Sequence, residues 1–106
     1  MHWLEIIRLL ASQAKADRVV EHLHEVAAAL ERTEGQEAVT VYSRQFMEGD
    51  LMICLHWQRD GEPHKSQEGL ALADYLTNFG MVDHELWVRR EVPMEAVPAN
   101  GDTRRN

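Results

Sequence analysis

The chain has 106 residues, enough for one domain with a single core. It carries 18 acidic and 11 basic residues, a net charge of −7, and no basic cluster of the kind that nucleic acid or an anionic membrane surface would require. The single cysteine, Cys54, excludes an internal disulfide, and the first residues have neither the basic start of a signal peptide nor an apolar stretch of membrane-spanning length, so we expect a cytoplasmic protein.

Residues 2–12 are predicted to form the first strand, because their apolar residues fall on both parities. One face would carry Trp3, Ile7 and Leu9, and the other Leu4, Ile6 and Leu10. A strand that is apolar on both faces is usually covered on both sides. Residues 15–33 are predicted as a helix, since apolar residues recur there at helical spacing and Gly35 follows as a stop.

Residues 38–46 and 51–58 are predicted to form an antiparallel hairpin, because both alternate and only four residues separate them. Gly49 is expected to take a positive φ in the turn. In the later strand, one face carries only large apolar residues: Leu51, Ile53, Leu55 and Trp57.

Ser66 is a suitable N-cap for a second helix that runs to about Phe79, with Leu70, Ala73 and Leu76 as its apolar stripe and Gly80 as its stop. Residues 82–92 are predicted as the last strand. We therefore expect one domain over residues 1–92 and a loose tail or arm over residues 93–106.

Four strands and two helices in β-α-β-β-α-β order predict an α+β, ferredoxin-like fold with a four-stranded antiparallel sheet. Right-handed crossovers place both helices on one face of that sheet. The strands are also apolar toward the other face, and soluble monomers rarely leave such a face exposed. A second copy of the sheet would cover it, which predicts a homodimer.

The run from Ser66 to Leu76 and the run from Phe79 to Trp87, after a strand that ends His56-Trp57, resemble the antibiotic biosynthesis monooxygenase-like group. That group belongs to the dimeric α+β barrel superfamily, and the resemblance implies two sheets packed face to face and a pocket between sheet and helices. Some members oxidise electron-rich aromatic substrates with O₂ and without metal or flavin. The haem-degrading branch uses an Asn on the first strand, a Trp ending the third and a His on the second helix; only Trp57 matches, which disfavours haem degradation.

Cofactor-free oxygenation needs a base near neutrality, a role that histidine suits. His56 and His84 are the candidate catalytic residues, because each is predicted at or near a strand end beside an aromatic residue. Tyr42, Trp57 and Trp87 are the candidate substrate-binding residues. Core or dimer packing is the alternative for the tryptophans. No metal-binding motif is present in the sequence, and no cofactor is expected.

The sequence thus favours a small monooxygenase-like homodimer that oxidises a hydrophobic aromatic or quinol-type substrate. The alternative is a non-catalytic module that binds a small apolar ligand or serves only in dimerisation. Neither nucleic acid nor membrane is an expected partner.

Overall fold

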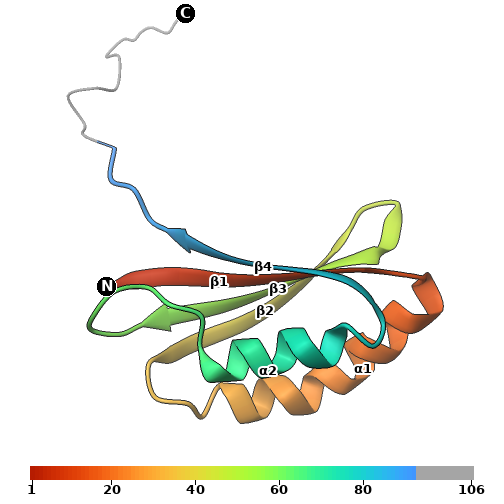
Figure 1. Ribbon diagram of the computed structural model, residues 1–106, viewed down its shortest axis with the longest axis horizontal. Helices are drawn as coiled ribbons and strands as arrows, with labels where there is room; N and C mark the ends of the chain where they lie inside the picture. The colour runs from red at the N-terminus through yellow and green to blue at the C-terminus, as the bar shows by residue number, and fades with distance from the viewer. Residues whose placement is uncertain (93–106) are drawn as a thin grey trace, which may run out of the picture.

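The computed structural model describes residues 1–92, and the tail predicted over residues 93–106 lies outside them. The elements follow the predicted order: β1 (His2–Ala11), α1 (Gln13–Leu30), β2 (Gln36–Arg44), β3 (Met47–Gln58), α2 (Gln67–Leu76) and β4 (Gly80–Val88). The ferredoxin-like α+β fold is therefore confirmed (Figure 1).

The four strands form one antiparallel sheet in the order β2-β3-β1-β4, and both helices lie against the same face of it (Figure 1). β1 is central: Trp3 is paired with Trp57 of β3 and Val88 of β4, and Ile7 with Ile53 and His84. These pairs fix which residues of the outer strands share a face with each residue of β1.

The core lies between the sheet and the helices. Its buried residues come from every element except β2 and β4: Trp3, Ile7, Leu9, Ala16, Val19, Leu23, Leu30, Leu51, Ile53, Leu55, Trp57, Leu72 and Leu76. Val39 of β2 and Val82 and Leu86 of β4 pack against them. The face of β1 with Trp3, Ile7 and Leu9 therefore lies toward the helices, as does the predicted apolar face of β3.

We call the other side of the sheet the open face, because no helix of residues 1–92 covers it (Figure 1). The register assigns to it Leu4, Ile6, Arg8 and Leu10 of β1, Thr40, Tyr42 and Arg44 of β2, Asp50, Met52, Cys54 and His56 of β3, and Met81, Asp83, Glu85 and Trp87 of β4. Met81, Trp87 and Tyr42 are 76%, 57% and 52% exposed. This face, which mixes apolar side chains with charged ones, is therefore left without cover within the described chain.

The hairpin turn differs from the prediction. It lies at Gln45 and Phe46, and Phe46 rather than Gly49 has the positive φ, of 68°. Gly49 is part of β3, where a Cβ would run into the carbonyl group of Ala11. The glycine is thus required by a close approach of two strands and not by the turn.

The buried stripe of α2 was predicted correctly for Leu76 and Ala73 but wrongly for Leu70. Gly69, Leu72 and Leu76 are buried, whereas Leu70 is half exposed. A glycine carries no apolar side chain and so gave no hydrophobic signal, although its helical spacing from Leu72 and Leu76 fits a buried stripe. Within residues 1–92, no helix has both the length and the apolarity needed to cross a membrane.

Candidate active site

A buried carboxylate is the most unusual feature of the core. Glu5 lies on β1 between Trp3 and Ile7, on the helix-covered face, and is 0% exposed. Burying an ionised group without partners is very unfavourable, so its surroundings must supply hydrogen bonds. Sequence reasoning missed this residue. The available signal was an acid in phase with Trp3, Ile7 and Leu9, on the apolar parity of a central strand.

Four donors converge on the Glu5 carboxylate. Oε1 accepts hydrogen bonds from Trp57 Nε1 at 2.9 Å and from Ser66 Oγ at 2.7 Å. Oε2 accepts from the backbone N–H of Ser66 at 3.1 Å and is 2.6 Å from Nε2 of His84. Each oxygen therefore has two partners, a set that suits the acceptor-only, ionised form of the side chain.

The start of α2 brings Ser66 to this carboxylate. Ser66 is the N-cap, as predicted, and its Oγ accepts a hydrogen bond from the N–H of Gly69 at 2.9 Å while donating to Glu5. A negative group at a helix N-terminus is favoured by the helix dipole. Gly69 allows the approach, because a Cβ there would lie 2.5 Å from the carboxyl carbon of Glu5.

His84 lies in the middle of β4, opposite Ile7, and not at the strand end that the sequence suggested. Its side chain is 9% exposed. Because Nε2 faces a carboxylate oxygen, the neutral ring carries its proton on Nε2, and Nδ1 retains a lone pair. Within residues 1–92, Nδ1 has no hydrogen-bond partner in the protein. The arrangement leaves one ring nitrogen free to act as a base.

Two tryptophans flank the carboxylate. Trp57 is buried, donates to Glu5, and has the guanidinium of Arg59 4.2 Å from its ring centre. Trp3 is buried beside it, with the His64 ring at 5.6 Å, and the described residues offer no acceptor to its Nε1. Trp57 is thus part of the Glu5 network, whereas sequence reasoning suggested that it contacts substrate.

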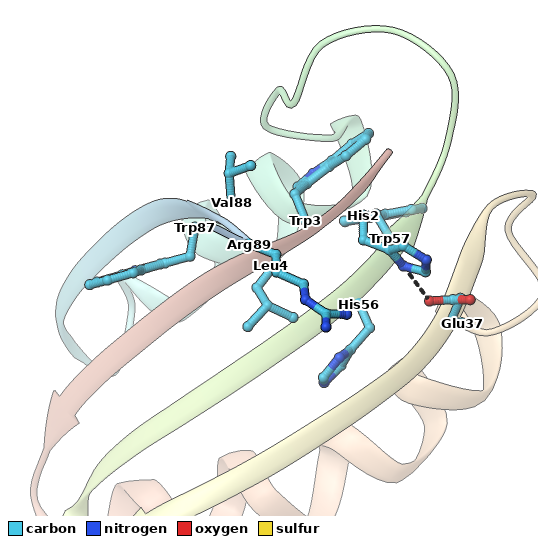
Figure 2. Close-up of a pocket in the computed structure, with 9 residues that line it drawn as sticks. All are labelled: His2, Trp3, Leu4, Glu37, His56, Trp57, Trp87, Val88 and Arg89. Atoms are coloured by element: carbon cyan, nitrogen blue, oxygen red, sulfur yellow. Dashed lines mark ion pairs between the residues drawn. The ribbon is translucent and has the colours of Figure 1, made fainter. Parts of the chain in front are cut away.

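The remaining predicted residues, His56, Tyr42 and Trp87, lie on the open face. His56 and Trp87 line one cavity of about 480 Å³ at the end of the sheet, where the edge of the buried Trp57 also reaches it (Figure 2). Tyr42 and Trp87 line a neighbouring hollow of about 570 Å³. The sheet therefore separates the two candidate bases: His56 is on the open face, with Nε2 3.2 Å from Thr40 Oγ1, and His84 is on the helix-covered face.

An ion-pair group lies on the open face near the hairpin end of the sheet. Arg8 donates two hydrogen bonds to Asp50, at 3.0 and 3.1 Å, and Arg44 approaches the same carboxylate at 3.4 Å. The Arg8 hydrogen bonds hold the pKa of Asp50 below its ordinary value.

Burial raises the pKa of the nearby Cys54 thiol, against a smaller opposing effect of a hydrogen bond from Thr40. Cys54 is therefore not an activated thiol.

Within residues 1–92, no three His, Cys, Asp or Glu side chains are grouped so that they could hold a metal ion. On the helix-covered side of the sheet, the buried titratable pair within these residues is the Glu5 carboxylate and the His84 imidazole. Such a pair can orient a histidine and accept a proton.

No protein-family model and no curated protein matches the sequence. Solved structures do match the fold. SnoaB, a cofactor-independent oxygenase from Streptomyces nogalater, is 16% identical with a TM-score of 0.62, over 86% of this chain and 95% of that one. A candidate antibiotic biosynthesis monooxygenase from Deinococcus radiodurans is 18% identical with a TM-score of 0.62, over 86% of this chain and 95% of that one. A conserved protein from Methanosarcina mazei is 10% identical with a TM-score of 0.68, over 85% and 94%. The chain thus has the ferredoxin-like fold of the antibiotic biosynthesis monooxygenase-like group, as the resemblance in sequence suggested.

Proposed function

We propose that this protein oxidises a hydrophobic aromatic or quinol-type substrate with O₂, without a bound cofactor, and that His84 is the base. The observation that carries the proposal is the 2.6 Å contact between His84 Nε2 and the buried Glu5 carboxylate. A carboxylate that fixes the tautomer of a histidine leaves the second ring nitrogen as the proton acceptor. The shared fold with a cofactor-independent oxygenase agrees with this chemistry.

The chemistry requires a base, a site for the substrate and stabilisation of charge as O₂ is reduced, and His84 supplies the base. For an anthrone-type substrate, Nδ1 of His84 removes a proton from the substrate, and the resulting anion donates electrons to O₂. A carbon–oxygen bond then forms, and loss of water leaves a carbonyl group, so that one oxygen atom enters the product and the other leaves as water. His84 returns the proton in that last step. Glu5 stabilises the imidazolium that forms in between.

In this proposal Glu5, Trp57 and Ser66 are positioning residues. Trp57 and Ser66 satisfy Oε1 of Glu5, and the Ser66 N–H shares Oε2 with His84. Because all four partners hold the carboxylate in one orientation, the imidazole is held as well. Loss of any one of them would loosen the His84 ring.

Oxygen uptake with dithranol, an anthrone, tests the base. His84→Ala should lower kcat about a hundredfold, the lower range for loss of a general base. Glu5→Gln keeps the shape of the side chain but offers an N–H to Nε2, which moves the ring proton to Nδ1; it should lower kcat as strongly. His56→Ala is the matched control on the other face and should leave the rate unchanged.

Thermal melts of each variant, followed by circular dichroism, separate loss of the base from loss of the fold. A full rate in folded His84→Ala would refute the role of His84. A loss confined to His56→Ala would move the base to the open face.

The same network also favours a second candidate function, a non-catalytic binding or dimerisation module. His84 is only 9% exposed, and Glu5 ties the start of α2 to β1, which a purely structural anchor would also do. In that case wild-type protein would consume no O₂ above the uncatalysed rate, while His84→Ala would still lower the melting temperature.

For the partner we infer a second copy of the chain, paired through the open face. That face carries exposed Met81, Leu10 and Trp87 together with both signs of charge, so two copies related by a two-fold axis can match acid to base. Sedimentation at micromolar concentration should show twice the 12.2 kDa chain mass. Met81→Glu should weaken the dimer about tenfold or more, because it would bury a charge, and Leu70→Glu on the outer side of α2 should not. A stable monomer would refute the inference.

A further inference from the structure

The outer surface of the two helices carries a groove that is separate from the sheet. Figure 1 shows α1 and α2 running in opposite directions, and residues of both line a hollow of about 360 Å³ between them. None of the described lining residues comes from a strand or from the Glu5 network. A second copy of the chain paired through the open face therefore leaves this groove accessible.

The floor of the groove is apolar and its rim is open. Val26, Leu30 and Leu72 line it and are buried or partly buried, whereas Ala29 and Ala71 line it and are exposed. Two alanines at the rim leave room that longer side chains would fill. The volume lies at the low end of the range for small-molecule sites, which suits a ligand with one ring and a short chain.

The two ends of the groove differ in chemistry. Because the helices are antiparallel, the end of α1 lies beside the start of α2, and there Thr33 and Glu68 line the groove. His22 and Tyr75 line the opposite end, with ring centres 5.5 Å apart. Phe79 extends this aromatic group, 5.2 Å from Tyr75. A carboxylate thus marks one end and aromatic rings mark the other.

The charge of the groove favours a cation. Among the described lining residues, Glu68 is the only acid, no lysine or arginine is present, and Glu68 forms no ion pair within residues 1–92. The last turn of α1 has no basic residue, so its carbonyl groups add partial negative charge at the same end. The positive end of the α2 dipole is already faced by Glu5. The net charge of −7 acts in the same direction.

We propose that this groove binds a small amphipathic amine that carries an aromatic ring. The ammonium group lies at Glu68 and Thr33, and the ring lies beside Tyr75 and His22. Glu68 and Tyr75 are about 10 Å apart along the axis of α2. A phenyl ring joined to an ammonium group by four methylene groups spans about that distance. Binding is non-covalent and stands whether or not the proposed oxidation occurs.

Titration of the full chain with 4-phenylbutylamine, followed by amide NMR, tests the site. The uncharged 4-phenylbutan-1-ol and the anionic 4-phenylbutyrate have a similar shape and are its comparators. The amine should bind about fivefold more tightly than the alcohol, the upper range for a partly exposed ionic contact, and the anion should bind most weakly. The amide signals of Ala29 and Ala71 should shift, and that of Tyr42 on the open face should not.

Two pairs of variants assign the contacts. Glu68→Gln should weaken the amine about fivefold and leave the alcohol unchanged, whereas Asp74→Asn, which changes an acid of α2 outside the groove lining, should alter neither. Ala29→Leu fills the groove and should weaken both compounds about tenfold. Ala28→Leu, at the neighbouring exposed alanine outside the lining, should leave both unchanged.

Raising NaCl from about 20 to about 500 mM should weaken the amine and not the alcohol, because salt screens the contact with Glu68. Three results would overturn the proposal. The first is no binding of the amine to wild-type protein. The second is equal affinity for the amine and either comparator, which would mean that apolar contact alone is at work. The third is undiminished binding in Ala29→Leu, which would place the ligand elsewhere. His84→Ala should bind the amine as wild type does, so this proposal and the proposed oxidation can fail separately.

Discussion

Replacing Gly69 with alanine should destabilise the protein although it improves the helix. Alanine is favoured over glycine by up to about 1 kcal/mol in a helix, and Gly69 lies in the first turn of α2. At this position, however, the added Cβ would meet the Glu5 carboxylate, with 2.5 Å to its carboxyl carbon and 2.9 Å to Oε1. Contacts this short force α2 or the carboxylate to move.

The magnitude follows from what such a movement breaks. Hydrogen bonds to a charged group contribute roughly 1.5–3 kcal/mol each, and four of them meet at Glu5. Losing two costs about 3–6 kcal/mol, from which the gain in helix preference removes about 1 kcal/mol. The unfolding free energy should therefore fall by about 2–5 kcal/mol. For a domain of this size, that is a drop in melting temperature of roughly 10–25 °C.

Urea unfolding followed by circular dichroism measures this change. Ala71→Gly, on the exposed side of α2, is the matched control, since it makes the reverse substitution and should cost only about 1 kcal/mol. The Trp57 indole N–H resonance reports the network directly, because that group donates to Glu5. It should shift in Gly69→Ala and stay in place in Ala71→Gly. A Gly69→Ala protein that is more stable by the full helix preference would show that α2 does not approach Glu5 this closely.

Three further predictions concern the open face and the hairpin turn. Hydrogen bonds with Arg8 lower the pKa of Asp50 in the folded state, so they stabilise the protein above the ordinary value of 3.8, and this stabilisation is lost as the pH falls through the lower folded value. The unfolding free energy, measured with urea between pH 6 and 2, should therefore decline less in Asp50→Asn than in wild type. Asp60→Asn is the control and should match wild type. Phe46 has a φ of 68°, which strains a residue with a side chain, and its ring is 89% exposed. Phe46→Gly should therefore raise the unfolding free energy by about 0.5–1 kcal/mol. A decrease in the same urea assay would show that Phe46 does not strain the turn. Burial raises the pKa of the Cys54 thiol in the folded state, so the unfolding free energy should decline as the pH rises past the ordinary value of 9.0. The buried thiol should also react with Ellman's reagent roughly a hundredfold faster in urea than in the native state. Equal reaction rates in the two conditions would show that the native thiol is accessible.

The fold could be predicted from the sequence because the apolar run in β1, the alternation in β3 and the helical spacing in α1 are strong local signals. The parity of β3, with Leu51 and Trp57 on the same face, agrees with the structure. The hairpin turn could not be placed in the same way. Gly49 looks like a turn residue, but its role is to admit the carbonyl group of Ala11, which is distant in sequence.

The candidate site was predictable only in part. His84 and Trp57 were singled out, but the residue that joins them was not, because Glu5 reads locally as a charge that interrupts an apolar strand. Its role depends on Ser66, sixty-one residues later, and on the β1–β4 register. That register also places His84 on the face opposite His56, whose own face followed from the apolar parity of β3.

The alternation of β1 has a consequence for how the chain tolerates change. Leu4 and Glu5 are neighbours in sequence, yet one lines the open-face cavity and the other lies in the core. A scan of all substitutions along residues 2–11 should therefore show two interleaved profiles with a period of two. Within the stricter profile, Glu5 should accept even fewer replacements than Ile7, because an apolar side chain would leave four buried donors unmatched. Deleting one residue from this strand would exchange the two profiles, and we expect that deletion to be less tolerated than any single substitution.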